Sequence, residues 1–165
     1  MRHALSALIL LLALPAMAAT RPWMPVEAGM QPEPAPAVAV VSVQTGLHAQ
    51  TGDSITIPVA VTQFDGVYGV DLSIAFDEAV LDAYDVQGAT FTEGMTLVFN
   101  VRQSGVVHIA LYGIYPTVGD GDLVRIRFHV AGGAGASTPI SITRCSFDEG
   151  RLPCEVFAGD FTVSE

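Results

Sequence analysis

The chain has 165 residues, of which 50% are hydrophobic, and it carries a formal net charge of −10 at neutral pH. A chain this negative is repelled at long range by nucleic acids and by anionic membranes, so we expect neither as a partner. No apolar run reaches the roughly 18 to 20 residues that a membrane-spanning helix needs, so no membrane span is expected.

The amino terminus has the three parts of a secretory signal peptide. Arg2 supplies a positive charge, residues 4–14 form an apolar core, and Ala16-Met17-Ala18 is a small-x-small cleavage site. We therefore expect residues 1–19 to be removed on export. The mature protein should be secreted, either into a periplasm or out of the cell.

Residues 20–37 are expected to form a proline-rich linker. Five prolines lie between residues 22 and 36. Proline lacks the amide donor that helices and β-ladders need, and it biases the preceding residue towards extended geometry. This composition predicts an extended tether, followed by a folded domain over residues 38–165.

From residue 38 onward the sequence is a series of short alternating runs separated by Gly, Asp and Pro. In the runs 55–61 and 70–76 every second residue is apolar, and a period of two buries one row of side chains and exposes the other. No stretch has a convincing helical period, and no internal repeat is found. The pattern predicts an antiparallel β-sandwich, with strands at 38–43, 54–63, 67–76, 80–86, 95–102, 106–112, 123–130, 139–143 and 160–163.

The two cysteines of the chain are Cys145 and Cys154. Export would place them in an oxidising compartment, where a disulfide is favoured over two free thiols. We expect this disulfide to brace a loop before the last strand. A redox-active pair would be spaced more tightly at the start of a helix.

The run 70–76 exposes a row of small residues that contains one carboxylate. Its outward positions, by alternation, are Gly69, Asp71, Ser73 and Ala75. A small, flat surface of this kind is suited to docking another protein. In the run 106–112 the same alternation turns His108, Ala110 and Tyr112 outward.

The order of short motifs along residues 38–163 resembles the cohesin domain, the module by which bacterial scaffold proteins capture dockerin-bearing enzymes. Residues 76–81, FDEAVL, look like the family's Tyr-Asp-Pro-x-Val-Leu. The other motifs share the family's order and spacing; they are TGD at 51–53 leading into ITIPV at 55–59, GVD at 69–71, FNV at 99–101 with SG at 104–105, GDLVRIRF at 121–128, and SFDEG at 146–150 leading to GDFTV at 159–163.

The resemblance implies a nine-stranded jelly-roll β-sandwich whose third, fifth, sixth and eighth strands form a dockerin-binding sheet. Asp71 matches a carboxylate that, in many cohesins, accepts hydrogen bonds from Ser or Thr of a dockerin helix. The expected partner-binding residues are those that share this face: Gly69, Asp71, Ser73, Ala75, His108, Ala110 and Tyr112. Two departures are visible, since Gly69 stands where many cohesins place Asn, and residues 113–118 are shorter than usual and lack a carboxylate.

The resemblance also implies that the dockerin-like partner brings the calcium, so no cofactor or metal is expected in this chain. Residues 119–122, GDGD, lack the alternating ligands and closing Glu of an EF-hand, and they are interpreted as a hairpin turn. Arg125, Arg127 and His129 form a basic row, which is typical of the exposed side of a half-buried strand.

The sequence predicts a protein that is not an enzyme. His48, His108 and His129 have no metal-ligand spacing, and no Gly-x-Ser-x-Gly elbow is present. We expect a secreted protein-recognition module connected with polysaccharide breakdown. The main alternative is a module on the same sandwich that binds the polysaccharide itself, and an accessory role in an export or pilus apparatus also remains open.

Overall fold

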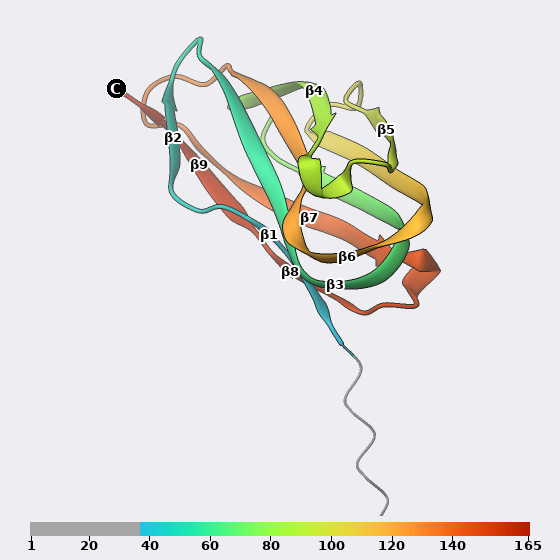
Figure 1. Ribbon diagram of the computed structural model, residues 1–165. Coiled ribbons are helices and arrows are strands. Elements are labelled where there is room, and N and C mark those ends of the chain that lie inside the picture. The colour runs from blue at the N-terminus through green and yellow to red at the C-terminus, as the bar shows by residue number, and fades with distance from the viewer. Residues whose placement is uncertain (1–36) are drawn as a thin grey trace, which may run out of the picture. The chain divides into compact units, whose positions relative to one another are not determined.

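The computed structural model describes residues 37–165 (Figure 1). The signal peptide expected at 1–19 and nearly all of the linker expected at 20–37 lie outside the described residues. Within the described part of the chain, no helix is long and apolar enough to cross a membrane.

Nine β-strands and two short 3-10 turns make up the described part of the chain. The 3-10 turns are η1 (Thr90–Thr92) and η2 (Asp148–Gly150). The strands are β1 (Ala39–Val43), β2 (Leu47–Gln50), β3 (Ser54–Ala75), β4 (Leu81–Gly88), β5 (Thr96–Asn100), β6 (Val106–Val130), β7 (Ser137–Phe147), β8 (Cys154–Phe157) and β9 (Gly159–Ser164).

Two of these strands, β3 and β6, are much longer than the sequence predicted. The expected strands 54–63 and 67–76 are one bent strand, β3, and 106–112 and 123–130 are one bent strand, β6. The turn signals between them form bulges rather than chain reversals, because β3 and β6 pair along their whole lengths and bend at the same place. There Phe64 lies opposite Gly119 and Val67 opposite Thr117. Figure 1 shows the two strands curving together.

The bends carry β3 and β6 from one layer of the sandwich to the other. One layer consists of β5, residues 106–112 of β6, residues 69–75 of β3 and residues 141–147 of β7. The other consists of β4, residues 124–130 of β6, residues 54–62 of β3, then β1 and β8. These ladders are antiparallel as predicted, apart from β1 with β8. The start of β7 pairs with β9, which is parallel to β2.

The core between the layers follows the alternation in the sequence. Val59 in β3 and Ile126 in β6 face inward in one layer, and Leu72 and Ile109 face inward in the other; all are at most 3% exposed. Burial of an aliphatic side chain contributes about 1.5–3 kcal/mol, so the alternating rows supply most of the drive for the layers to pack.

Aromatic rings fill the space inside the bend. Phe64 is 1% exposed and makes edge-to-face contacts with Phe91 and Phe147, at ring-centre distances of 5.8 and 5.2 Å. A Cβ atom at Gly121 would stand 2.8 Å from Phe91, so only glycine allows this ring to cover the bend. The glycines of the 119–121 segment therefore serve the bend rather than a tight hairpin.

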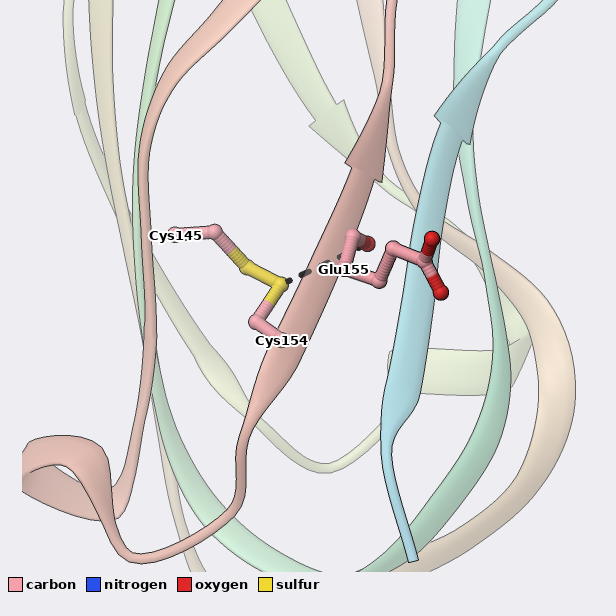
Figure 2. The surroundings of a disulfide bond; sticks show 3 residues. All are labelled: Cys145, Cys154 and Glu155. Carbon is pink, nitrogen blue, oxygen red and sulfur yellow. Dashed lines mark hydrogen bonds between the residues drawn. A yellow bond between two sulfur atoms is a disulfide. The ribbon is translucent and has the colours of Figure 1, made fainter.

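The predicted disulfide is confirmed. Cys145 in β7 and Cys154 in β8 are joined, with Cα atoms 6.3 Å apart (Figure 2). β8 was not predicted as a strand, and within residues 37–165 it forms a ladder with β1 alone. The disulfide therefore closes the segment 146–153, which contains η2, into a loop. It also links the start of β8 to β7.

We expect the double variant Cys145→Ser/Cys154→Ser to fold but to lose about 2–3 kcal/mol of unfolding free energy, because the unfolded chain is no longer cross-linked. Urea unfolding followed by circular dichroism measures this loss. Wild-type protein reduced with dithiothreitol is the matched control and should unfold with the same free energy as the variant. Equal stability of the oxidised and reduced proteins would contradict the prediction.

Candidate protein-binding face

The outward side of the layer made by β5, β6, β3 and β7 contains all seven residues predicted to bind a partner. We call this surface the Asp71 face. The register of β3 with β6 places Gly69 opposite Tyr112, Asp71 opposite Ala110, and Ser73 opposite His108; Ala75 lies at the end of the same row. The structure thus brings the predicted residues together, and their role stays a prediction.

The two outer strands of this layer add residues to the face that the sequence analysis missed. Val98 of β5 lies beside Ala110, and Asn100 lies beside His108. On the other side Ser146 of β7 lies beside Asp71, and Arg144 lies beside Ser73. Alternation within 96–100 identifies which residues share a side of β5, but only the register between distant strands places them next to Asp71.

Asp71 lies near the centre of the face with its carboxylate available. Its Oδ2 atom is 3.9 Å from Nη2 of Arg144, and the two side chains are 57% and 66% exposed. An exposed ion pair at this distance contributes little to stability, of the order of 0–1 kcal/mol. Among the described residues no donor is hydrogen-bonded to the Asp71 carboxylate, so its oxygens can accept hydrogen bonds from another molecule.

Ser73 is not exposed, which corrects the sequence prediction. It is only 7% exposed, and its hydroxyl is hydrogen-bonded to the ring of His108. Ser73 Oγ is 2.9 Å from His108 Nδ1, and His108 Nε2 is 3.0 Å from Gln103 Oε1. If the amide oxygen of Gln103 accepts from Nε2–H, then Nδ1 accepts from the serine hydroxyl.

This serine–histidine pair fixes the surface rather than forming a nucleophile and its base. A nucleophilic serine must reach its substrate, and the group that orients its histidine is usually a carboxylate. Here the serine is buried and the third group is an exposed amide. The hydrogen bonds fix the position of the His108 ring between Ser73 and Gln103.

An open cavity of about 520 Å³ lies at the Gly69 end of the face. Its walls include Tyr68, Tyr112, Asp71, Asp148 and Glu149. Asp148 and Glu149 belong to the SFDEG motif at 146–150, where no partner-binding residue was predicted.

Asp148 joins this loop to β3 at the point where β3 is irregular. Its Oδ1 atom accepts hydrogen bonds from the amides of Tyr68 and Gly69, at 2.9 and 2.7 Å. Its Oδ2 atom accepts a hydrogen bond from Arg151 at 2.8 Å, and Arg151 also donates to the carbonyl of Gly66 at 3.0 Å. The loop is therefore held against the Asp71 face by a carboxylate that satisfies two strand amides.

Several large apolar side chains are exposed on and beside the Asp71 face. Val98 is 53% exposed, Tyr112 55% and Tyr68 44%, and in the adjoining part of β6 Ile114 is 83% and Tyr115 77% exposed. Gathered apolar and tyrosine side chains with few charges are typical of surfaces that bind other proteins.

The basic row lies on the other layer and is neutralised within the chain. Arg125 pairs with Asp122 at 2.8 Å, and Arg127 lies 3.6 Å from Asp85 and over the ring of Tyr84. Asp120 of the 119–122 segment accepts a hydrogen bond from the amide of Gln63 at the bend. These charges have structural partners, and no group of three metal-binding side chains is found in residues 37–165.

Comparison with known proteins identifies the family. The cohesin domain family model matches residues 39–156. The chain therefore belongs to the cohesin family, as the motifs indicated. A search of curated protein sequences finds no significant match.

Solved structures with the same fold are cohesins of low sequence identity. A non-cellulosomal cohesin from the hyperthermophilic archaeon Archaeoglobus fulgidus has a TM-score of 0.69 at 18% identity, covering 78% of this chain and 93% of that one. A type I cohesin–dockerin complex from Clostridium thermocellum, Coh-OlpC with Doc435, has a TM-score of 0.67 at 16% identity, covering 80% and 97%.

A third structure is the sixth cohesin of scaffoldin B from Acetivibrio cellulolyticus in complex with a Cel5 dockerin mutant. Its TM-score is 0.66 at 17% identity, and the match covers 76% of this chain and 99% of that one. Together with the nine strands of this chain, these likenesses confirm the predicted jelly-roll β-sandwich.

We expect Asp148→Gly to lower the unfolding free energy by about 1–3 kcal/mol, because the amides of Tyr68 and Gly69 lose their acceptor. Glycine tolerates the positive φ of 45° at this position, so the substitution adds no backbone strain. Hydrogen exchange at the two amides should become faster, and urea unfolding measures the loss of stability.

Asp148→Asn is the matched control, because its amide oxygen can replace Oδ1 while the charge is removed. We expect it to lose clearly less stability than Asp148→Gly and to keep the two amides protected. Equal losses in both variants would show that the ion pair with Arg151, not the amide hydrogen bonds, holds the loop.

Proposed function

We propose that this chain is a non-catalytic recognition module that binds a dockerin-like protein through the Asp71 face. The observation that carries the proposal is the available Asp71 carboxylate on the exposed sheet of a cohesin-family domain. Two of the structurally similar cohesins were solved in complexes with dockerins, which supports a partner of that class.

The chemistry of the face suits a helical partner that carries hydroxyl or amide donors. Asp71 would accept their hydrogen bonds, and a bond to a charged acceptor is stronger than one between neutral groups. Gly69, Ala75 and Ala110 have no bulky side chains, so the backbone of a helix could approach the sheet closely. Tyr112 would supply apolar contact area at one end of the contact.

The wider setting follows from the sequence. We infer that residues 1–19 direct export, that residues 20–37 act as a tether, and that the domain works outside the cell or in a periplasm. The partner would supply the calcium, and the assembly would serve polysaccharide breakdown.

Binding to a panel of purified dockerins, including Doc435 and the Cel5 dockerin, tests the partner class. We expect at least one dockerin to bind residues 20–165, as measured by isothermal titration calorimetry, and the binding to be lost when a chelator removes calcium. Retention on insoluble polysaccharide without any dockerin binding would favour the carbohydrate-binding alternative.

For a dockerin that binds, we expect Asp71→Ala to weaken the complex by about 1–3 kcal/mol, because the partner's donors lose their charged acceptor. Stability should change by less than about 0.5 kcal/mol, since Asp71 is exposed and only loosely paired. Asp82→Ala, at an exposed position on β4 in the other layer, makes the same charge change and should leave binding unaltered. Equal affinity of the Asp71→Ala variant and the wild type would refute the site.

A further inference from the structure

We propose that the cavity at the Gly69 end of the Asp71 face is a subsite that receives a lysine or arginine side chain of the partner. This inference rests on the proposed protein-binding function and adds the chemistry of one contact. Three observations carry it. Gly69 has no side chain although the backbone does not require glycine there, the charged groups of the cavity walls are carboxylates, and two exposed tyrosine rings lie beside them.

Nothing in the local structure of β3 requires glycine at position 69. Its φ lies outside the left-handed region that favours glycine. A Cβ atom there would stand 3.7 Å from Oδ1 of Asp148 and 3.9 Å from the carbonyl oxygen of Leu111, which are ordinary contact distances. The backbone and its neighbours would therefore accept a Cβ atom here, and the absence of a side chain leaves the cavity open at this point of its wall.

The charged groups that line the cavity are all carboxylates. They belong to Asp71, Asp148 and Glu149. Asp148 is committed to the strand amides and to Arg151, whereas the Glu149 and Asp71 side chains are exposed and accept no hydrogen bond within residues 37–165. Arg144 lies 3.9 Å from the Asp71 carboxylate and Arg151 lies 2.8 Å from that of Asp148, but neither arginine lines the cavity. Glu149 has no cation partner within residues 37–165, so the walls keep a net negative charge that favours a positive group.

The shape and the remaining walls favour a side chain over a metal ion. Tyr68 and Tyr112 are 44% and 55% exposed beside the carboxylates. Aromatic faces of this kind suit the aliphatic stem and the cationic head of lysine or arginine. A bound cation would need several converging ligands, and no group of three metal-binding side chains occurs among the described residues.

The subsite can be tested without knowing the partner. The probes are the blocked tripeptides acetyl-Gly-Arg-Gly-amide and acetyl-Gly-Lys-Gly-amide, titrated into isotopically labelled residues 20–165 and followed by the protein's amide chemical shifts. We expect saturable shifts at the amides of Tyr68, Gly69 and Tyr112, with a dissociation constant of about 1–10 mM for so small a ligand. The glutamate tripeptide should cause no saturable shift.

Two variants separate the cavity from the general acidity of the surface. Gly69→Asn fills the opening and should weaken tripeptide binding about tenfold or abolish it, with the unfolding midpoint unchanged. Glu149→Gln removes one wall charge and should weaken binding about threefold. Asp82→Asn removes a charge of the same sign on the other layer, and it should bind the tripeptides as the wild type does.

Shifts that do not saturate, that spread over the acidic surface, or that persist unchanged in Gly69→Asn would overturn the subsite. This result is distinguishable from failure of the proposed function. If a dockerin binds while the tripeptides do not, the recognition role stands and the subsite falls. If the tripeptides bind at the cavity while no dockerin does, the subsite stands and the partner belongs to another class of protein.

Discussion

The structure depends on one antiparallel ladder, in which β3 and β6 pair from end to end and bend together. The pairing runs from Ser54 opposite His129 to Ala75 opposite Val106. Each strand serves both layers, and the bulges at the bend shift the register of the ladder between one layer and the other. Phe64 fills the inside of the bend, so the crossing point is also a packing centre. The position of Asp71 opposite Ala110 is set by the register that this ladder adopts after the bulges at the bend.

The sequence predicted the inward rows well because alternation is a local property. Val59, Leu72, Ile109 and Ile126 are buried as expected, since a period of two needs no knowledge of the neighbouring strand. Whether a turn signal reverses the chain or only bends it depends on the neighbouring strands, so it cannot be decided from the local sequence. The 119–122 segment contains the residues of a hairpin turn, and it became a bulged bend because β3 continues beside it.

The sequence predicted which residues of each strand face outward at the candidate site, but not the contacts between residues of different strands. Asp71, Ala110 and Tyr112 follow from alternation and from the family resemblance, whereas Ser73 is buried and hydrogen-bonded to a ring on another strand. Asp148 is 79 residues from Gly69 in the sequence, so no spacing or motif could have paired them. Its one signal was an Asp–Glu pair before a glycine, which any solvated turn could contain.

The two ends of the Asp71 face are fixed by different means, and this difference bears on how the face can recognise a partner. At the Ser73 end, hydrogen bonds from Ser73 through His108 to Gln103 hold one ring against the sheet. At the Gly69 end, the disulfide closes the loop that presents Asp148, and Asp148 binds the β3 amides. A face that is rigid before contact loses little conformational entropy on binding. Under the proposed function, discrimination between partners would fall to the Asp71 and Glu149 carboxylates, which accept no hydrogen bond within residues 37–165, and to the space left by Gly69.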